Sequence, residues 1–127
     1  MITQQLINPS SIVIVGGSND IAKPGGKVLK NLIDNHFGGQ LYVVNPKEVE
    51  IQGIKCHKSV DELPVCDLAI LAIAAKSCPD TVETLSRDKN TRAFIILSAG
   101  FHEESAEGAI LENRIVDTVN KYGACLI

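Results

Sequence analysis

The sequence alternates between short apolar runs, rich in Val, Ile, Leu and Ala, and longer stretches in which apolar residues recur at helical spacing. Short β-branched runs bounded by Gly, Pro or Asn are typical of strands that are buried on both faces of a parallel sheet. Parallel strands need crossover connections, and the amphipathic stretches between the runs can provide them. The expected strands are residues 12–15, 41–44, 68–73, 93–97 and 124–127.

Three amphipathic segments are expected to form helices between these strands. The first carries an apolar stripe from Val28 to Phe37, the second begins after Ser77, and the third has apolar residues on one side from Leu111 to Tyr122. Residues 47–64 form a polar, irregular segment with one helical turn, which a capping box at Ser59 opens. This order predicts an α/β fold with a doubly wound five-stranded parallel sheet and helices on both faces. We expect the strand order 3-2-1-4-5, numbered along the chain.

Composition excludes several classes of protein. The 127 residues are enough for one domain, which we assign to residues 1–127. With 12 basic and 15 acidic residues the net charge is −3, which disfavours binding to nucleic acid. No apolar run is long enough to cross a bilayer, and a signal-peptide pattern is missing. We therefore expect a soluble, cytoplasmic protein with no nucleic-acid or membrane partner.

The four cysteines have neither a CxxC pair nor the close spacing of a zinc site. We therefore expect no metal site. Free, buried thiols in a reducing compartment are the simplest interpretation of Cys56, Cys66, Cys78 and Cys125.

Four loops rich in small residues follow the expected strands, at residues 16–20, 45–47, 74–76 and 98–101. In a doubly wound sheet, ligands bind beyond the carboxyl ends of the strands, so we expect these loops to form the site. A dinucleotide fingerprint needs glycine at the first, third and sixth positions of the first loop. Those positions hold Gly16, Ser18 and Ile21, so the fingerprint fails, although exposed amides and a helix N-terminus still favour an anion.

The end of the second strand distinguishes between classes of cofactor. Proteins that bind NAD usually place Asp or Glu here to hold the ribose hydroxyls. This chain has Asn45-Pro46-Lys47 instead. A lysine suits a ribose that carries a phosphate, which leaves NADP and coenzyme A as candidates.

No residue of the chain is predicted to be catalytic. His102 follows the fourth strand, but no nucleophile-elbow motif G-x-S-x-G accompanies it. We expect His102 to be a solvated histidine at the entrance of a helix.

Taken together, the segments from Ile14 to Asp20, Lys23 to Gly26, Val44 to Lys47, Ala75-Lys76 and Ser98 to Phe101 resemble one known family. They are similar, in order and spacing, to the CoA-binding, Rossmann-like domain of ADP-forming acetyl-CoA synthetases, which is related to the alpha subunit of succinyl-CoA synthetase. The resemblance covers nearly the whole chain. It implies coenzyme A as the cofactor. Two alternatives stay open. The segment from Ser98 to Phe101, which resembles the synthetases, disfavours a stand-alone CoA-binding protein, and the failed fingerprint and the missing catalytic residues disfavour an NADP-binding domain of a reductase or sensor.

The resemblance also implies a role for each loop. The first loop would surround the nucleotide end of coenzyme A, Lys47 would pair with a phosphate of the cofactor, and the loop after the fourth strand would contact the pantetheine arm. Ala74 stands where the family usually has proline. The residues implied to bind coenzyme A are Gly16, Gly17, Ser18, Asn19, Asp20, Gly25, Lys47, Ala75, Lys76, Ser98, Ala99 and Gly100.

In this family, acyl-phosphate and phosphohistidine chemistry involves further synthetase domains or a beta-type nucleotide-binding subunit. The resemblance implies that the chain is the N-terminal part of a longer synthetase, an acid–thiol ligase that positions coenzyme A for acyl transfer from an acyl phosphate. We expect the 127 residues alone to bind coenzyme A without completing a reaction.

Overall fold

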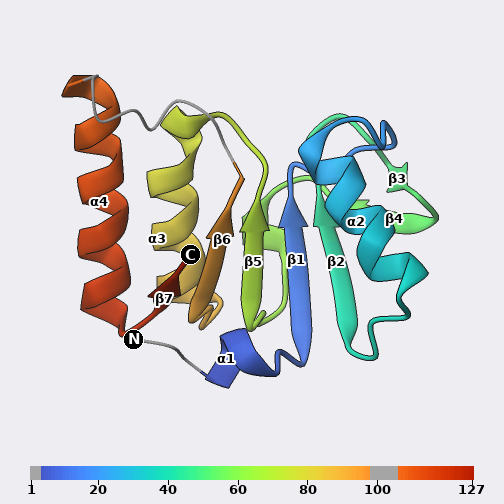
Figure 1. Ribbon diagram of the computed structural model, residues 1–127, viewed down its shortest axis with the longest axis horizontal. Helices are drawn as coiled ribbons and strands as arrows, with labels where there is room; N and C mark the ends of the chain where they lie inside the picture. Colours follow the sequence, from blue (N-terminus) through green and yellow to red (C-terminus); the bar gives the residue numbers. More distant parts are fainter. Residues whose placement is uncertain (1–3, 98–105) are drawn as a thin grey trace.

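The structure is a computed structural model that describes residues 4–97 and 106–127. In these residues one sheet of seven strands lies between helices (Figure 1). The strands are β1 (Ser11–Val15), β2 (Gln40–Val44), β3 (Glu50–Ile51), β4 (Ile54–His57), β5 (Leu68–Leu71), β6 (Ala93–Ile96) and β7 (Cys125–Leu126). The helices are α1 (Gln4–Ile7), α2 (Pro24–Asp34), α3 (Cys78–Asp88) and α4 (Ala106–Tyr122), with 3-10 turns η1 (Val60–Glu62) and η2 (Ala75–Ser77).

The sheet has the order β3-β4-β2-β1-β5-β6-β7. Strand β1 lies in the middle and pairs in parallel with β2 on one side and with β5 on the other. Strand β4 pairs in parallel with β2, and β3 is antiparallel to β4 in a short hairpin. The predicted doubly wound α/β fold with a parallel sheet is therefore confirmed, and the hairpin adds two strands to the five that were expected.

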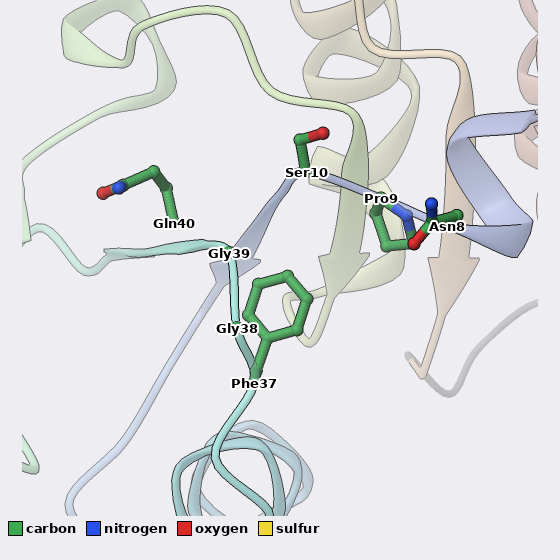
Figure 2. A pocket seen from close by; sticks show the side chains of 7 residues that line it. All are labelled: Asn8, Pro9, Ser10, Phe37, Gly38, Gly39 and Gln40. Atoms are coloured by element: carbon green, nitrogen blue, oxygen red, sulfur yellow. The ribbon is translucent and has the colours of Figure 1, made fainter.

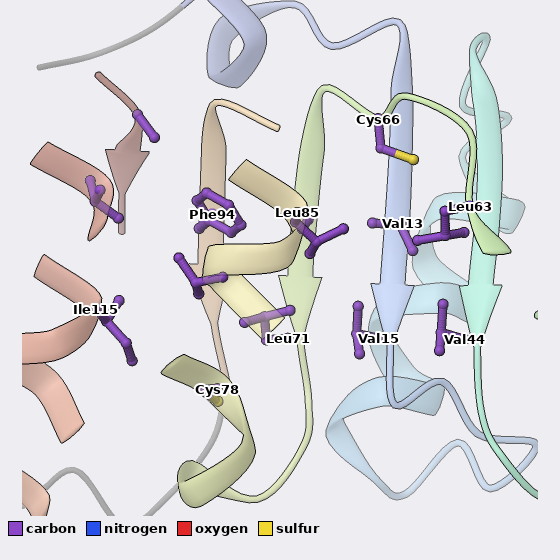
Figure 3. Packing of buried hydrophobic residues seen from close by; sticks show 14 residues of the cluster. Val13, Val15, Val44, Leu63, Cys66, Leu71, Cys78, Leu85, Phe94 and Ile115 are labelled. Atoms are coloured by element: carbon purple, nitrogen blue, oxygen red, sulfur yellow. The ribbon is translucent and has the colours of Figure 1, made fainter. Parts of the chain in front are cut away.

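Both faces of the sheet are covered by apolar residues. All five residues of β1 are buried, because alternate side chains enter two different cores. On one face, Val13 packs with Phe94, Leu85 of α3 and Ile115 of α4 (Figure 3). On the other face, β1 packs against α2, where Leu29 is fully buried. Strands that are apolar throughout are thus explained by burial on both faces.

The predicted strand order 3-2-1-4-5 is wrong. The third expected strand, β5, lies beside β1 and not beside β2, so the expected strands run 2-1-3-4-5 across the sheet. The connection from β4 to β5 packs Leu63 and Cys66 on the face of α3 and α4, opposite to α2. Because crossovers are right-handed, a connection on this face leads the chain back past β1, whereas a connection on the face of α2 would lead it outward beyond β2. The β3–β4 hairpin also occupies the outer edge of β2.

Two predicted helix caps are only partly confirmed. Residues 60–62 form the expected single turn, and α3 begins directly after Ser77. However, neither Ser59 nor Ser77 makes a side-chain hydrogen bond as a cap. In the part of the chain that the structure describes, no helix has both the length and the apolar character needed to cross a membrane.

Candidate functional site

The loops after the central strands meet at the carboxyl edge of the sheet, as predicted, because these strands are parallel (Figure 1). Backbone hydrogen bonds join neighbouring strand ends there. The N–H of Gly16 donates to the carbonyl of Val44 at 2.9 Å, and that of Leu97 donates to the carbonyl of Leu71 at 2.8 Å. Ser98, Ala99 and Gly100, which were predicted to contact the cofactor, lie outside the described residues.

The loop between β1 and α2 is folded by its own side chains. The Oγ of Ser18 accepts a 3.0 Å hydrogen bond from the N–H of Asp20. The Oδ1 of Asp20 accepts one of 2.9 Å from the N–H of Ala22, and its carbonyl accepts one of 3.1 Å from the N–H of Lys23. Two predicted ligand-binding residues, Ser18 and Asp20, therefore also set the shape of the loop.

Two glycines of the site are required by close packing within the chain. Gly16 has a φ of 90°, and a Cβ on it would collide with the carbonyl oxygen of Ala72. A Cβ on Gly25 would collide with the carbonyl oxygen of Gly16. The start of α2 therefore lies directly against the end of β1, and backbone packing alone explains why these positions are glycine.

Helix α2 begins with its N-terminus at this edge of the sheet. Lys23 is its N-cap and makes no side-chain cap hydrogen bond, and no acidic residue lies in the first turn. Lys27 is the first residue whose N–H donates to the turn before it, at 2.9 Å from the carbonyl of Lys23. The N–H groups of Gly25 and Gly26 come before that point, so they belong to the helix end that attracts anions.

The loop after β2 presents Lys47. The side-chain amide of Asn45 has two partners: its Oδ1 accepts from the N–H of Lys47 at 2.8 Å, and its Nδ2 donates to the carbonyl of Gly17 at 3.0 Å. Lys47 itself is exposed, and its ammonium group makes no ion pair with any described residue. An exposed cationic residue thus lies beside the first loop.

Residues 74–76 lie between β5 and α3. Ala75 is half-buried at the start of η2, and Lys76 is exposed. Ala74, which stands where the family usually has proline, has φ −58° and ψ 142°. This φ lies within the range that proline imposes, so the backbone at Ala74 has a conformation that proline could also adopt.

Two hollows lie at opposite ends of the strands. One of about 350 Å³ lies between the start of α2 and the end of β6, and Ala22, Pro24, Val28 and Leu97 are among the residues that line it. The other, of about 530 Å³, is shown in Figure 2 and is lined by Asn8, Pro9, Ser10, Phe37, Gly38, Gly39 and Gln40. The second hollow lies at the amino ends of β1 and β2, away from every predicted site residue that the structure describes.

The sequence interpretation missed Gln52. This residue lies in the turn between β3 and β4, and its side-chain Nε2 donates to the carbonyl oxygens of Ser18 and Gly26, both at 2.9 Å. The signal that could have revealed the hairpin is Gln52-Gly53 between Ile51 and Ile54. Two-residue turns ending in glycine between apolar residues are typical of hairpins.

None of the described residues forms an evident nucleophile or metal centre. All four cysteines are free and buried, as predicted. Burial raises the pKa of the Cys66 thiol to about 11 and, with the nearby charge of Glu48, raises that of Cys56. No group of three or more His, Cys, Asp or Glu side chains in residues 4–97 and 106–127 could hold a metal ion. His102 lies outside these ranges.

The fold is that of a doubly wound α/β domain, a class of protein that binds its ligands beyond the carboxyl ends of the strands. Residues 10–122 match the family described as the CoA binding domain. The chain therefore belongs to the family of CoA-binding domains, and coenzyme A is its cofactor. This match favours coenzyme A over NADP, which Lys47 alone left open.

Three similar proteins are informative. The chain is 38% identical over 125 residues to an ADP-forming acetate–CoA ligase I of Archaeoglobus fulgidus, covering 98% of the chain and 18% of that protein. It is 40% identical over 121 residues to the alpha subunit of an ADP-forming acetate–CoA ligase II of Pyrococcus furiosus, covering 94% and 26%. A structure of a dinucleotide-forming acetyl-coenzyme A synthetase from Candidatus Korarchaeum cryptofilum has a TM-score of 0.86 and 27% identity, covering 98% and 27%. The chain thus spans about a quarter or less of these proteins.

Proposed function

We propose that this domain supplies coenzyme A to an ADP-forming acyl-CoA synthetase, in which the coenzyme receives an acyl group from an acyl phosphate. The single observation that carries the proposal is the similarity of nearly the whole chain to ADP-forming acetate–CoA ligases, at 38% and 40% identity. The family of CoA-binding domains by itself would also include stand-alone binding proteins. Similarity to the ligases favours the synthetase.

In the proposed binding mode, the diphosphate of coenzyme A accepts hydrogen bonds from N–H groups of residues 17–19 and from the start of α2 at Gly25. Lys47 pairs with the 3′-phosphate of the ribose. Support comes from the uncapped, acid-free first turn of α2 and from the unpaired ammonium of Lys47. Anions bind favourably at such helix ends.

The pantetheine arm then passes Ala75 and Lys76 towards residues 98–100. The hollow between α2 and Leu97, at about 350 Å³, supports this path, since it is lined largely by apolar side chains next to the last described residue of that loop. Apolar clefts with a few polar groups are the usual form of cofactor sites.

The chemistry itself is assigned to parts of the enzyme other than these 127 residues: further synthetase domains or a beta-type nucleotide-binding subunit. The raised thiol pKa values of Cys56 and Cys66 support this assignment, because a protonated thiol is a weak nucleophile. We expect no acyl-CoA synthetase turnover from the chain alone with saturating nucleotide, phosphate and acyl-CoA. A cytoplasmic location is proposed with it, supported by the four free cysteines.

Amide NMR spectroscopy tests the binding mode directly. During titration with coenzyme A, the N–H signals of Gly17, Ser18, Asn19 and Gly25 should shift, together with those of Lys47 and Lys76. Signals of Ser10 and Gly38, at the opposite edge of the sheet, serve as the control and should stay in place. Shifts confined to that opposite edge would contradict the proposed site.

A further inference from the structure

The turn of the β3–β4 hairpin places a glutamine, Gln52, at a position where the backbone φ is positive. Ile51 pairs with Ile54, and the two residues between them, Gln52 and Gly53, have φ values of 49° and 84°. Two-residue turns with both φ values positive favour Asn or Gly at the first position. A glutamine there adopts a left-handed conformation that is costly for its residue type, which raises the question of what its side chain does.

The side chain of Gln52 connects the hairpin both to the β1–α2 loop and to the first turn of α2. Its Nε2 donates to the carbonyl of Ser18 in the loop and to that of Gly26 in the first turn of α2, at 2.9 Å each. Its backbone N–H donates to Oδ1 of Asn19 at 2.8 Å, and Nδ2 of Asn19 lies 3.4 Å from the carbonyl of Glu50. The hairpin therefore holds the loop at three residues.

The hairpin is anchored to the rest of the domain by core packing and by strand pairing. Ile51 is fully buried in the core on the face of α2, where Leu29 and Val43 also pack. Strand β4 pairs with β2, so the hairpin is fixed both by the sheet and by the core. Gln52 therefore projects towards the loop from a hairpin that strand pairing and core packing hold in place.

These hydrogen bonds determine which way the loop's N–H groups point. In a trans peptide unit, the carbonyl and the following N–H point in opposite directions. Asn45 holds the carbonyl of Gly17, and Gln52 holds the carbonyl of Ser18, so the N–H groups of Ser18 and Asn19 point away from these two donors. Within the described part of the chain, neither N–H group has a hydrogen-bond partner.

We propose that Gln52 is a positioning residue for coenzyme A: by holding the carbonyls of Ser18 and Gly26, it orients the N–H groups of the loop towards the diphosphate. The inference rests on the proposed placement of the diphosphate at this loop. It adds a residue outside the strand-end loops to the binding site and gives the β3–β4 hairpin a function. Removing the Gln52 amide should weaken binding by loosening the loop, although Gln52 does not touch the ligand.

Substituting Gln52 with glycine or glutamate distinguishes a role in positioning the loop from a role in folding. Gln52→Gly removes both side-chain hydrogen bonds but also relieves the positive φ, so the two effects oppose each other and stability against urea should change little. Because the loop's N–H groups are then no longer held towards the diphosphate, the Kd for coenzyme A should rise about five- to thirtyfold. Gln52→Glu keeps the length of the side chain but cannot donate, so it should weaken binding at least as much. His36→Gly is the matched control, since it relieves a φ of 54° at the C-terminal end of α2, away from the loop.

The experiment measures the Kd of the 127-residue chain and its variants for coenzyme A and dephospho-coenzyme A by calorimetry. Both ligands carry the diphosphate, so Gln52→Gly should weaken both by the same factor and reduce the ligand-induced shifts of the Ser18 and Asn19 amide signals. His36→Gly should bind like the wild type.

Three outcomes would overturn the proposal. Unchanged affinity in Gln52→Gly or Gln52→Glu would show that the amide has no role in binding. A loss of affinity matched by an equal loss of folding stability in Gln52→Gly would show a purely structural role. Wild-type binding without any shift of the Ser18 and Asn19 signals would instead overturn the placement of the diphosphate, and the role of Gln52 with it.

Discussion

The side-chain amide of Asn45 donates a 3.0 Å hydrogen bond to the carbonyl oxygen of Gly17 and so joins the loop after β2 to the loop after β1. Its other end accepts from the N–H of Lys47. Asn45→Asp keeps the acceptor and removes the donor, placing two oxygens opposite each other. We expect the free energy of unfolding to fall by about 1–3 kcal/mol, measured by urea denaturation. A variant as stable as the wild type would show that the hydrogen bond contributes nothing.

Backbone packing at Gly25 gives a second prediction. Gly25→Ala places a Cβ against the carbonyl oxygen of Gly16, so the start of α2 must move away from β1. We expect a destabilisation of about 1–3 kcal/mol, as for other overpacked positions, and weaker binding of coenzyme A.

Gly38→Ala is the matched control for that substitution. A Cβ on Gly38 meets no atom within 4 Å, so the same chemical change should alter stability by no more than about 0.5 kcal/mol. Equal losses in the two variants would contradict the packing argument.

Much of the fold could be predicted from the sequence because its signals are local. The β-branched run at β1 and the apolar stripe of α2 each identify an element without knowledge of its neighbours. The strand order could not be predicted, because it depends on which face Leu63 and Cys66 cover after a segment with no strong periodicity.

The candidate site, like the fold, could be predicted from the sequence only in part. Loops that follow parallel strands must meet at one edge, so the residues around Gly16 and Lys47 could be predicted to lie together. The contact of Gln52 with Ser18 joins residues 34 positions apart through one side chain. It depends on the geometry of a hairpin that the sequence interpretation treated as irregular, and so it was found only in the structure.

The buried thiol of Cys66 predicts a loss of stability in alkali. Its pKa is about 11 in the folded protein, because burial opposes the thiolate, whereas an unfolded cysteine titrates near 8.5. Between these values the unfolded chain releases the proton and the folded chain keeps it. Stability therefore falls as pH rises through this window, by at most about 1.4 kcal/mol per pH unit.

Urea denaturation between pH 8 and pH 11 measures this effect, with Cys66→Ala as the reference that lacks the thiol. The variant should be less stable than the wild type at neutral pH, since it leaves a cavity, but the difference should shrink as pH rises. A difference that stays constant across this range would mean that Cys66 titrates normally in the folded protein.

Lys47 tests the assignment of the 3′-phosphate. Lys47→Ala should weaken binding of coenzyme A by about 1.5–3 kcal/mol at most, and by less where water screens the pair. Dephospho-coenzyme A lacks the partner group and should be barely affected. Raised salt should reduce the preference of the wild type for coenzyme A. Equal losses for both ligands would show that Lys47 contacts another part of the cofactor.

The most direct test of a coenzyme A site at the carboxyl edge of the sheet is calorimetric titration of the wild-type chain with coenzyme A, NADPH and ATP under identical conditions. All three ligands are phosphorylated nucleotides, so a site that merely attracts anions would bind them similarly. We predict saturable binding of coenzyme A with one ligand per chain, and binding of NADPH and ATP at least tenfold weaker, a difference of about 1.4 kcal/mol. Binding of NADPH as tight as that of coenzyme A, or no binding of coenzyme A at all, would contradict the account.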